Sequence, residues 1–169
     1  MQLLPSRLVR SSSMQVTYIV LDDHNPLHRE LSIYRTGIIQ RICMDDAAYK
    51  TYGSLEVDGH NYAACFHYGL VESLNRLPFL SESGSGLESG EEALLHRSRL
   101  AEFLCIVKEA LATLDNTHRE TILVGWQQEP VAIAYLRALD AERFATFLIS
   151  LLHFVEESEL QQYDLEFLW

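Results

Sequence analysis

Two apolar stripes with helical spacing lie in the second half of the 169-residue chain. In both, apolar side chains recur at steps of three and four residues, which is the pattern of a helix with one buried face. The stripes are Leu100, Phe103, Leu104, Val107, Leu111 and Leu114, and then Phe144, Phe147, Leu148, Leu151, Leu152 and Val155. Asp140, a typical N-cap residue, stands before the second stripe. Because each stripe must be buried, the fold needs a further layer to cover it.

The first half of the chain supplies candidates for that layer, because its patterns are those of strands. Residues 15–21 (QVTYIVL) are rich in β-branched and aromatic side chains and stop at a turn sequence, DDHNP. Residues 27–44 predict two strands broken near Gly37, with a helix over 27–34 as the alternative. Asp58-Gly59 is a strong hairpin signal between two runs with strand character.

Strands that precede helices are typical of an α+β fold. We therefore expect a mainly antiparallel sheet from the N-terminal half, packed against two to four helices from the C-terminal half. A single domain over residues 14–169 fits the length. Residues 1–13 are expected to form a flexible N-terminal extension, or to follow an upstream start that precedes Met14. Because they lack a continuous apolar run, a secretory signal is not expected.

A segment rich in Ser, Gly and Glu separates the two halves. Residues 81–92 (SESGSGLESGEE) predict either a mobile loop or a domain boundary. Within it, Ser89 and Glu92 have the spacing of a capping box, in which each side chain bonds to a free backbone amide at a helix start. The sequence therefore predicts a helix that begins here and ends at about Leu114.

A short apolar run follows that helix. Residues 121–127 (TILVGWQ) are typical of a buried strand. Trp126 is expected to be a core anchor whose indole N–H bonds to a carbonyl. Pro130 then permits a helix to start, because proline is tolerated in the first helical turn.

The formal net charge is −11, from 24 acidic and 13 basic residues. Acids gather in residues 82–92 and 156–169, and neither stretch contains Lys or Arg. A nucleic-acid-binding surface needs a basic footprint, and an anionic membrane disfavours an acidic protein. A basic protein is the partner that this charge would attract. The alternative is that the acidity only keeps the protein soluble.

Two stretches carry residues that could do chemistry. The loop Asp22–His28 contains metal-capable side chains, but Pro26 lies inside it and the sequence is also ordinary turn chemistry. Cys65 and His67 would share one face of a strand, as a nucleophile and its base, or Cys65 could simply be packed. The three cysteines form no CxxC, which indicates a reducing compartment. Neither a metal nor a cofactor is expected.

The chain ends on QQYDLEFLW, in which large rings alternate with acids. This period of two predicts a strand. The strand is either buried in a sheet or an exposed edge that binds a partner, and a helix continuing from Glu159 is a third option. The candidate partner-binding residues are Tyr163, Asp164, Glu166, Phe167, Trp169, Glu156 and Glu157.

These features favour a cytoplasmic, non-enzymatic module that binds a basic protein. A concrete version is an inhibitor or immunity-type protein that neutralises a basic toxin or nuclease, because an acidic inhibitor can occupy a surface built for phosphate. One alternative is a small hydrolase that uses the Asp22–His28 loop or Cys65 and His67. The other is an oligomerising structural subunit, a homo-oligomer with the aromatic terminus buried between copies.

Overall fold

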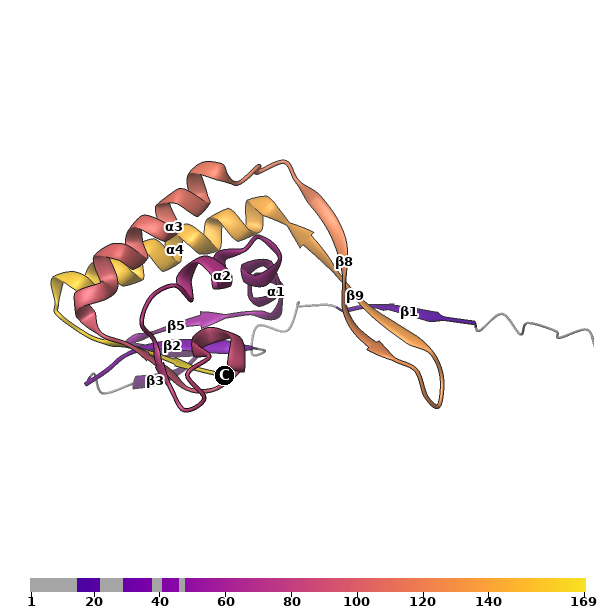
Figure 1. Ribbon diagram of the computed structural model, residues 1–169, viewed down its shortest axis with the longest axis horizontal. Coiled ribbons are helices and arrows are strands. Elements are labelled where there is room, and N and C mark those ends of the chain that lie inside the picture. The colour runs from indigo at the N-terminus through magenta and orange to yellow at the C-terminus, as the bar shows by residue number, and fades with distance from the viewer. Residues whose placement is uncertain (1–14, 22–28, 38–40, 46–47) are drawn as a thin grey trace, which may run out of the picture.

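The chain has an α+β fold, as its sequence predicts (Figure 1). The computed structural model describes residues 15–21, 29–37, 41–45 and 48–169, so the predicted extension 1–13 and the loop Asp22–His28 lie outside the described residues. The strands are β1 (Thr17–Val20), β2 (Leu31–Arg35), β3 (Arg41–Asp45), β4 (Ala48–Tyr52), β5 (Ser54–Val57), β6 (Leu80–Ser81), β7 (Ala93–Leu95), β8 (Arg119–Gln127), β9 (Ile133–Asp140) and β10 (Leu165–Leu168). The helices are α1 (Gly59–His67), α2 (Leu70–Leu74), α3 (Leu100–Thr113) and α4 (Ala141–Leu160), with short 3-10 turns at Gly86–Ser89 and Arg97–Arg99.

A five-stranded antiparallel sheet in the order β5-β2-β10-β7-β6 forms one layer of the body. The helices gather on one face of this sheet, with α3 and α4 lying side by side (Figure 1). Both predicted helical stripes are confirmed, since they supply fully buried residues such as Phe103, Phe144 and Leu148. The expected separation of the halves is not kept, because α1 and α2 come from the first half and β7 to β10 from the second.

The predicted strands on either side of Gly37 are confirmed as β2 and β3. Gly37 has φ +88°, a conformation that favours glycine. The alternative helix over 27–34 is wrong, because residues 31–34 pair with β5 and residues 32–34 also pair with β10. Among the described residues, none of the helices has the length and apolar content that crossing a bilayer requires.

The C-terminal stretch forms β10, which is an interior strand. Leu165 and Phe167 point into the core and are 0% and 2% exposed, so the predicted buried strand is confirmed. Hydrogen-bonded neighbours lie on both sides, β2 on one and β7 on the other. The alternative of an exposed edge open to a partner strand is therefore wrong, as is a helix continuing from Glu159 through this stretch.

The hairpin predicted at Asp58-Gly59 is wrong, since helix α1 begins there. The Asp58 carboxylate caps this helix by accepting a hydrogen bond from the Asn61 amide at 2.8 Å. Tyr62 and Phe66, one helical turn apart, meet edge to face at 5.1 Å. Asp is favoured both in turns and at N-caps, and here the capped helix, which buries Ala64 and Cys65, is formed.

Helix α3 begins eight residues later than Glu92, and the predicted capping box does not form. The Ser89 hydroxyl instead donates to the Gly86 carbonyl at 2.8 Å. Residues 93–95 become β7, because Ala93 and Leu95 are buried beside β10. Residues that the local pattern assigned to a helix therefore form a strand, because they pair with a strand distant in the sequence. The predicted helix end at about Leu114 is confirmed.

Strands β1, β9 and β8 form a separate sheet, which we call the arm. The β8–β9 hairpin projects beyond the helical body, and β1 pairs with β9 in parallel (Figure 1). The strand predicted at residues 121–127 is confirmed, but its predicted burial is wrong, because Trp126 is 50% exposed rather than a core anchor. The helix predicted after Pro130 is also wrong, since β9 follows; Asp140 then caps α4 as predicted.

Candidate functional site

The predicted Cys65–His67 pair does not exist. Both residues lie on helix α1, where two positions differ by about 200° around the axis, so they face different ways. Burial, with a smaller contribution from the Asp58 charge, raises the pKa of Cys65 to about 12. The thiol therefore stays protonated at neutral pH, and the His67 Nε2 atom lies 2.8 Å from a Glu120 carboxylate oxygen instead.

The aromatic members of the predicted partner-binding set do not share an open surface. Phe167 is in the core, where its ring meets Phe79 edge to face at 5.3 Å. Tyr163 and Trp169 are partly buried, and the Trp169 ring contacts that of Tyr62 at 5.3 Å. These rings hold the terminal segment on the body.

The acidic members of that set mostly have partners within the chain. The Asp164 carboxylate accepts the Arg97 amide at 2.8 Å. Glu157 pairs with Arg35 at 2.8 Å. Glu156 lies 3.6 Å from the Lys108 ammonium. Their negative charge is therefore partly balanced within the body.

Glu166 is different, because the structure brings it against another acid, Glu92. Hydrogen bonding to Glu92, then burial and the Glu92 charge, raise the pKa of Glu166. Glu92 also lines a surface groove of about 370 Å³. The other lining residues are Leu80, Ser81, Glu82, Glu91 and Leu94. The two acidic segments identified in the sequence thus contact each other through Glu92, beside this groove, which we call the acidic groove.

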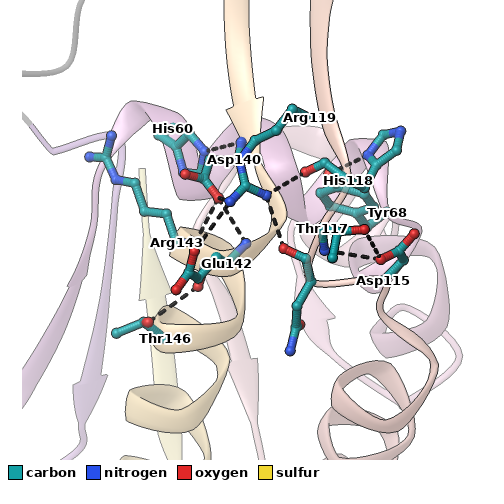
Figure 2. Close-up of polar contacts among 11 residues, drawn as sticks. His60, Tyr68, Asp115, Thr117, His118, Arg119, Asp140, Glu142, Arg143 and Thr146 are labelled. Atoms are coloured by element: carbon teal, nitrogen blue, oxygen red, sulfur yellow. Dashed lines mark hydrogen bonds and ion pairs between the residues drawn. The ribbon is translucent and has the colours of Figure 1, made fainter.

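A polar network fixes the arm to the body (Figure 2). The Asp140 carboxylate accepts the backbone amides of Glu142 and Arg143 at 2.8 and 3.2 Å, and so caps α4. The Arg119 guanidinium, at the start of β8, lies 3.2 Å from the Asp140 and Glu142 carboxylates. Since His60 Nε2 accepts the Asp140 amide at 3.0 Å, its proton lies on Nδ1. The base of the arm is therefore held by both α1 and α4.

A second polar group lies beside this network. The Tyr68 hydroxyl is 2.9 Å from His118 Nδ1, and the other ring nitrogen of His118 is 3.5 Å from Glu120 (Figure 2 shows the first contact). His67 contacts the same Glu120 carboxylate. Burial and the Glu120 charge raise the pKa of Tyr68, which makes its hydroxyl a poor nucleophile. Tyr68 and His118 border a pocket of about 280 Å³. Within the described parts of the chain, no three His, Cys, Asp or Glu side chains are placed to hold a metal ion.

The arm carries a large apolar surface that the body does not cover. Strand register places two rows of side chains across its three strands. One row is Tyr18, Ala134 and Trp126, and the other is Val20, Leu136 and Leu123. We call these six residues the arm face. Tyr18, Val20, Leu123 and Trp126, on the two outer strands, are 68%, 59%, 60% and 50% exposed. On the central strand, Ala134 is 2% exposed and Leu136 is partly buried. Large apolar side chains are more often buried in a folded chain.

The opposite face of the arm is turned towards the body. Leu139 and Arg137 on this face are buried, and Tyr135 lies across Gly125, where a Cβ atom would meet its ring at 3.5 Å. Between the arm and α1 is an open cleft of about 550 Å³, and the arm residues that line it include Leu123 of the arm face as well as Arg137. Tyr62 and Phe66 are among the residues that line it. Ile19 on this opposite face is 39% exposed, less than each of the four large residues of the arm face, so the described part of the chain covers the arm face least.

Sequence reasoning missed the arm face because its apolar strands are typical of a core. A usable signal was the charge distribution, since residues 15–21, 121–128 and 130–136 contain no charged side chain in a chain with 22% charged residues. Comparison with known proteins finds no family model, no curated protein and no solved structure that matches the chain. The functional argument therefore rests on the geometry.

Proposed function

We propose that the chain is an acidic, non-catalytic protein-binding module and that the arm is its docking element. The observation that carries this proposal is the arm face, where four large apolar side chains are each at least half exposed on β1 and β8, the two strands that flank β9. Contiguous apolar surface of this kind marks protein interaction sites in soluble proteins. The polar network at the base of the arm supports the same role, because it holds the arm in a fixed orientation relative to the body.

The hydrolase alternative has weaker support among the described residues. The thiol of Cys65 is buried and protonated, and the raised pKa of Tyr68 disfavours attack by its hydroxyl. His67 and His118 both contact Glu120, which accounts for their positions without a substrate. The predicted loop Asp22–His28 adds no support, because it lies outside the described residues.

A second candidate function is neutralisation of a basic protein, as an inhibitor or immunity-type protein in the cytoplasm. The observation that favours it is the Glu92–Glu166 contact at the acidic groove. Two neighbouring carboxylates repel each other, and a Lys or Arg from a partner would replace that repulsion by attraction. The net charge of −11 would also accelerate the encounter with a basic protein. Nucleic acid and membrane surfaces carry the wrong charge for this role.

Affinity capture with matched variants tests both candidates. The bait is the tagged full chain, used at low and high salt and compared with Leu123→Glu and with the double variant Glu92→Gln/Glu166→Gln. An exposed pair elsewhere, Glu72→Gln/Glu109→Gln, controls for the same change in net charge. Captured proteins are identified by mass spectrometry and then titrated as purified proteins.

The two surfaces give different expected results. An arm-face partner is lost with Leu123→Glu and retained at high salt, because the contact is apolar. A basic partner at the acidic groove is lost with Glu92→Gln/Glu166→Gln and at high salt, but not with the control pair. Equal binding by wild type and both site variants would refute both locations.

A further inference from the structure

We infer that the arm face binds a second copy of this chain, with the two faces stacked about a two-fold axis. This inference rests on the proposed function of the arm as a docking element and names its partner. A two-fold interface is self-complementary, so the same patch must serve on both sides. An apolar patch meets this condition, because it needs no opposite charge on the partner.

Charge is the first observation that favours a second copy. Each copy has a net charge of −11, so two copies repel each other over most of their surfaces. They can associate only through a surface on which neither copy has unpaired acidic side chains. The strands of the arm face contain no charged residue over 17–20, 121–128 and 130–136. A basic partner would instead select a face bearing carboxylates, such as the acidic groove.

The projection of the arm is the second observation. Strand β8 has nine residues and therefore spans about 30 Å. Figure 1 shows the hairpin extending away from α3 and α4. Two copies joined through their arms can thus keep their helical bodies apart by more than the Debye length, which is about 8 Å at physiological salt. The repulsion between the two acidic bodies is then largely screened.

The available area suits such a contact. With aromatic side chains of about 150–250 Å², the exposed fractions of Tyr18 and Trp126 correspond to about 200–300 Å². Val20 and Leu123 extend this surface along the adjacent row. A standard interface buries about 800 Å² per partner, of which somewhat more than half is apolar. The arm face therefore supplies most of the apolar area that one side of a dimer needs.

Stacking of faces is favoured over pairing of strand edges. The register of β8 against β9 shifts between Leu123 and Gly125, which is a bulge in the outer strand of the arm. Bulges in edge strands disfavour edge-to-edge pairing. Edge pairing would also leave the arm face uncovered. Stacked sheets lie about 10 Å apart, which allows the side chains of the two faces to interdigitate.

Sedimentation equilibrium of the purified full chain tests the inference. Wild type is expected to show twice the chain mass of 19.4 kDa, and its dimer should be no weaker at high salt. Val20→Glu and Trp126→Ala are expected to raise the dimer dissociation constant at least about tenfold. The matched control is Ile19→Glu on the same strand, because Ile19 pairs with Tyr135 on the opposite face. Circular dichroism verifies that each variant is folded.

Three results would overturn the second copy as partner. The first is that wild type is a monomer at about 100 µM, a concentration at which even weak dimers form. The second is that the dimer dissociation constant is unchanged by Val20→Glu and Trp126→Ala. The third is that Ile19→Glu raises this dissociation constant as much as the arm-face variants do. Suppose that wild type is a monomer in solution and that Leu123→Glu abolishes the capture of a different protein. That outcome would refute the second copy as partner but would leave the docking role of the arm intact. If arm-face variants changed neither the mass nor the captured proteins, the proposed docking role of the arm would fail as well.

Discussion

Leu165 and Leu123 make a matched test of the fold, because both are leucines within strands and only one is covered. Leu165 lies in β10 and is 0% exposed, whereas Leu123 lies in β8 and is 60% exposed. Leu165→Ala should lower the free energy of unfolding by about 2–5 kcal/mol, from lost burial and the cavity that remains. Leu123 is only about two-fifths buried, so Leu123→Ala removes much less buried apolar surface. The expected decrease in the free energy of unfolding is therefore about 1 kcal/mol or less.

Urea unfolding followed by far-UV circular dichroism at low protein concentration measures both changes. Low concentration matters because a second copy bound to the arm would add stability by mass action. The cost of Leu123→Ala is therefore expected to increase with protein concentration, and that of Leu165→Ala should increase much less. Equal costs for the two variants at low concentration would refute the conclusion that the arm face is uncovered.

Three further outcomes are expected. Glu166→Gln should raise the free energy of unfolding at pH 7 by less than about 1 kcal/mol. The raised pKa means that the folded state holds the Glu166 proton more tightly than the unfolded state, so the contribution of this group to stability increases as pH falls. The advantage of the variant over wild type should therefore disappear in acid, which thermal melts of both proteins at pH 7 and pH 4 will test. Asp140→Ala should cost about 1–2 kcal/mol in urea unfolding and Asp140→Asn much less, because only asparagine retains the cap; equal costs would contradict the capping role. Alkylation followed by peptide mapping should label exposed Cys105 in the native protein but buried Cys65 only after denaturation, and native labelling of Cys65 would contradict its burial.

The sequence predicts the long helices well because their signals are local and repeated. The six positions of the second stripe and the Asp140 cap all agree on α4, and the structure buries most of that stripe. The period-two pattern of Leu165 and Phe167 similarly identifies β10. In these elements the local pattern and the long-range packing favour the same structure, so either is sufficient for a correct prediction.

The errors arise where one local signal fits two structures. Asp58 is suited both to a hairpin turn and to a helix cap, and the burial of Ala64 on a helix decides between them. Ser89 and Glu92 have capping-box spacing, but Ala93 pairs with Phe167, more than 70 positions away. A local pattern contains no information about such a partner, so β7 could not be predicted from it.

The candidate site was hardest to predict because burial is a property of the assembled fold. Leu123 and Trp126 belong to a strand that is typical of a core, and only the position of the arm outside the helical body leaves them exposed. Phe167 shows the reverse: a ring expected to bind a partner is buried between β2 and β7. Residue type indicated apolar surface in both cases, and topology determined which surface remained open.

The interior position of β10 has a consequence for synthesis on the ribosome. Strands β2 and β7 are translated long before residues 165–168, yet they are joined only through that strand. Until β10 emerges from the exit tunnel, the nascent sheet consists of two separate halves with open edges, and such edges attract other chains. Ribosome-bound chaperones are therefore expected to protect this polypeptide until residues 165–168 have left the exit tunnel.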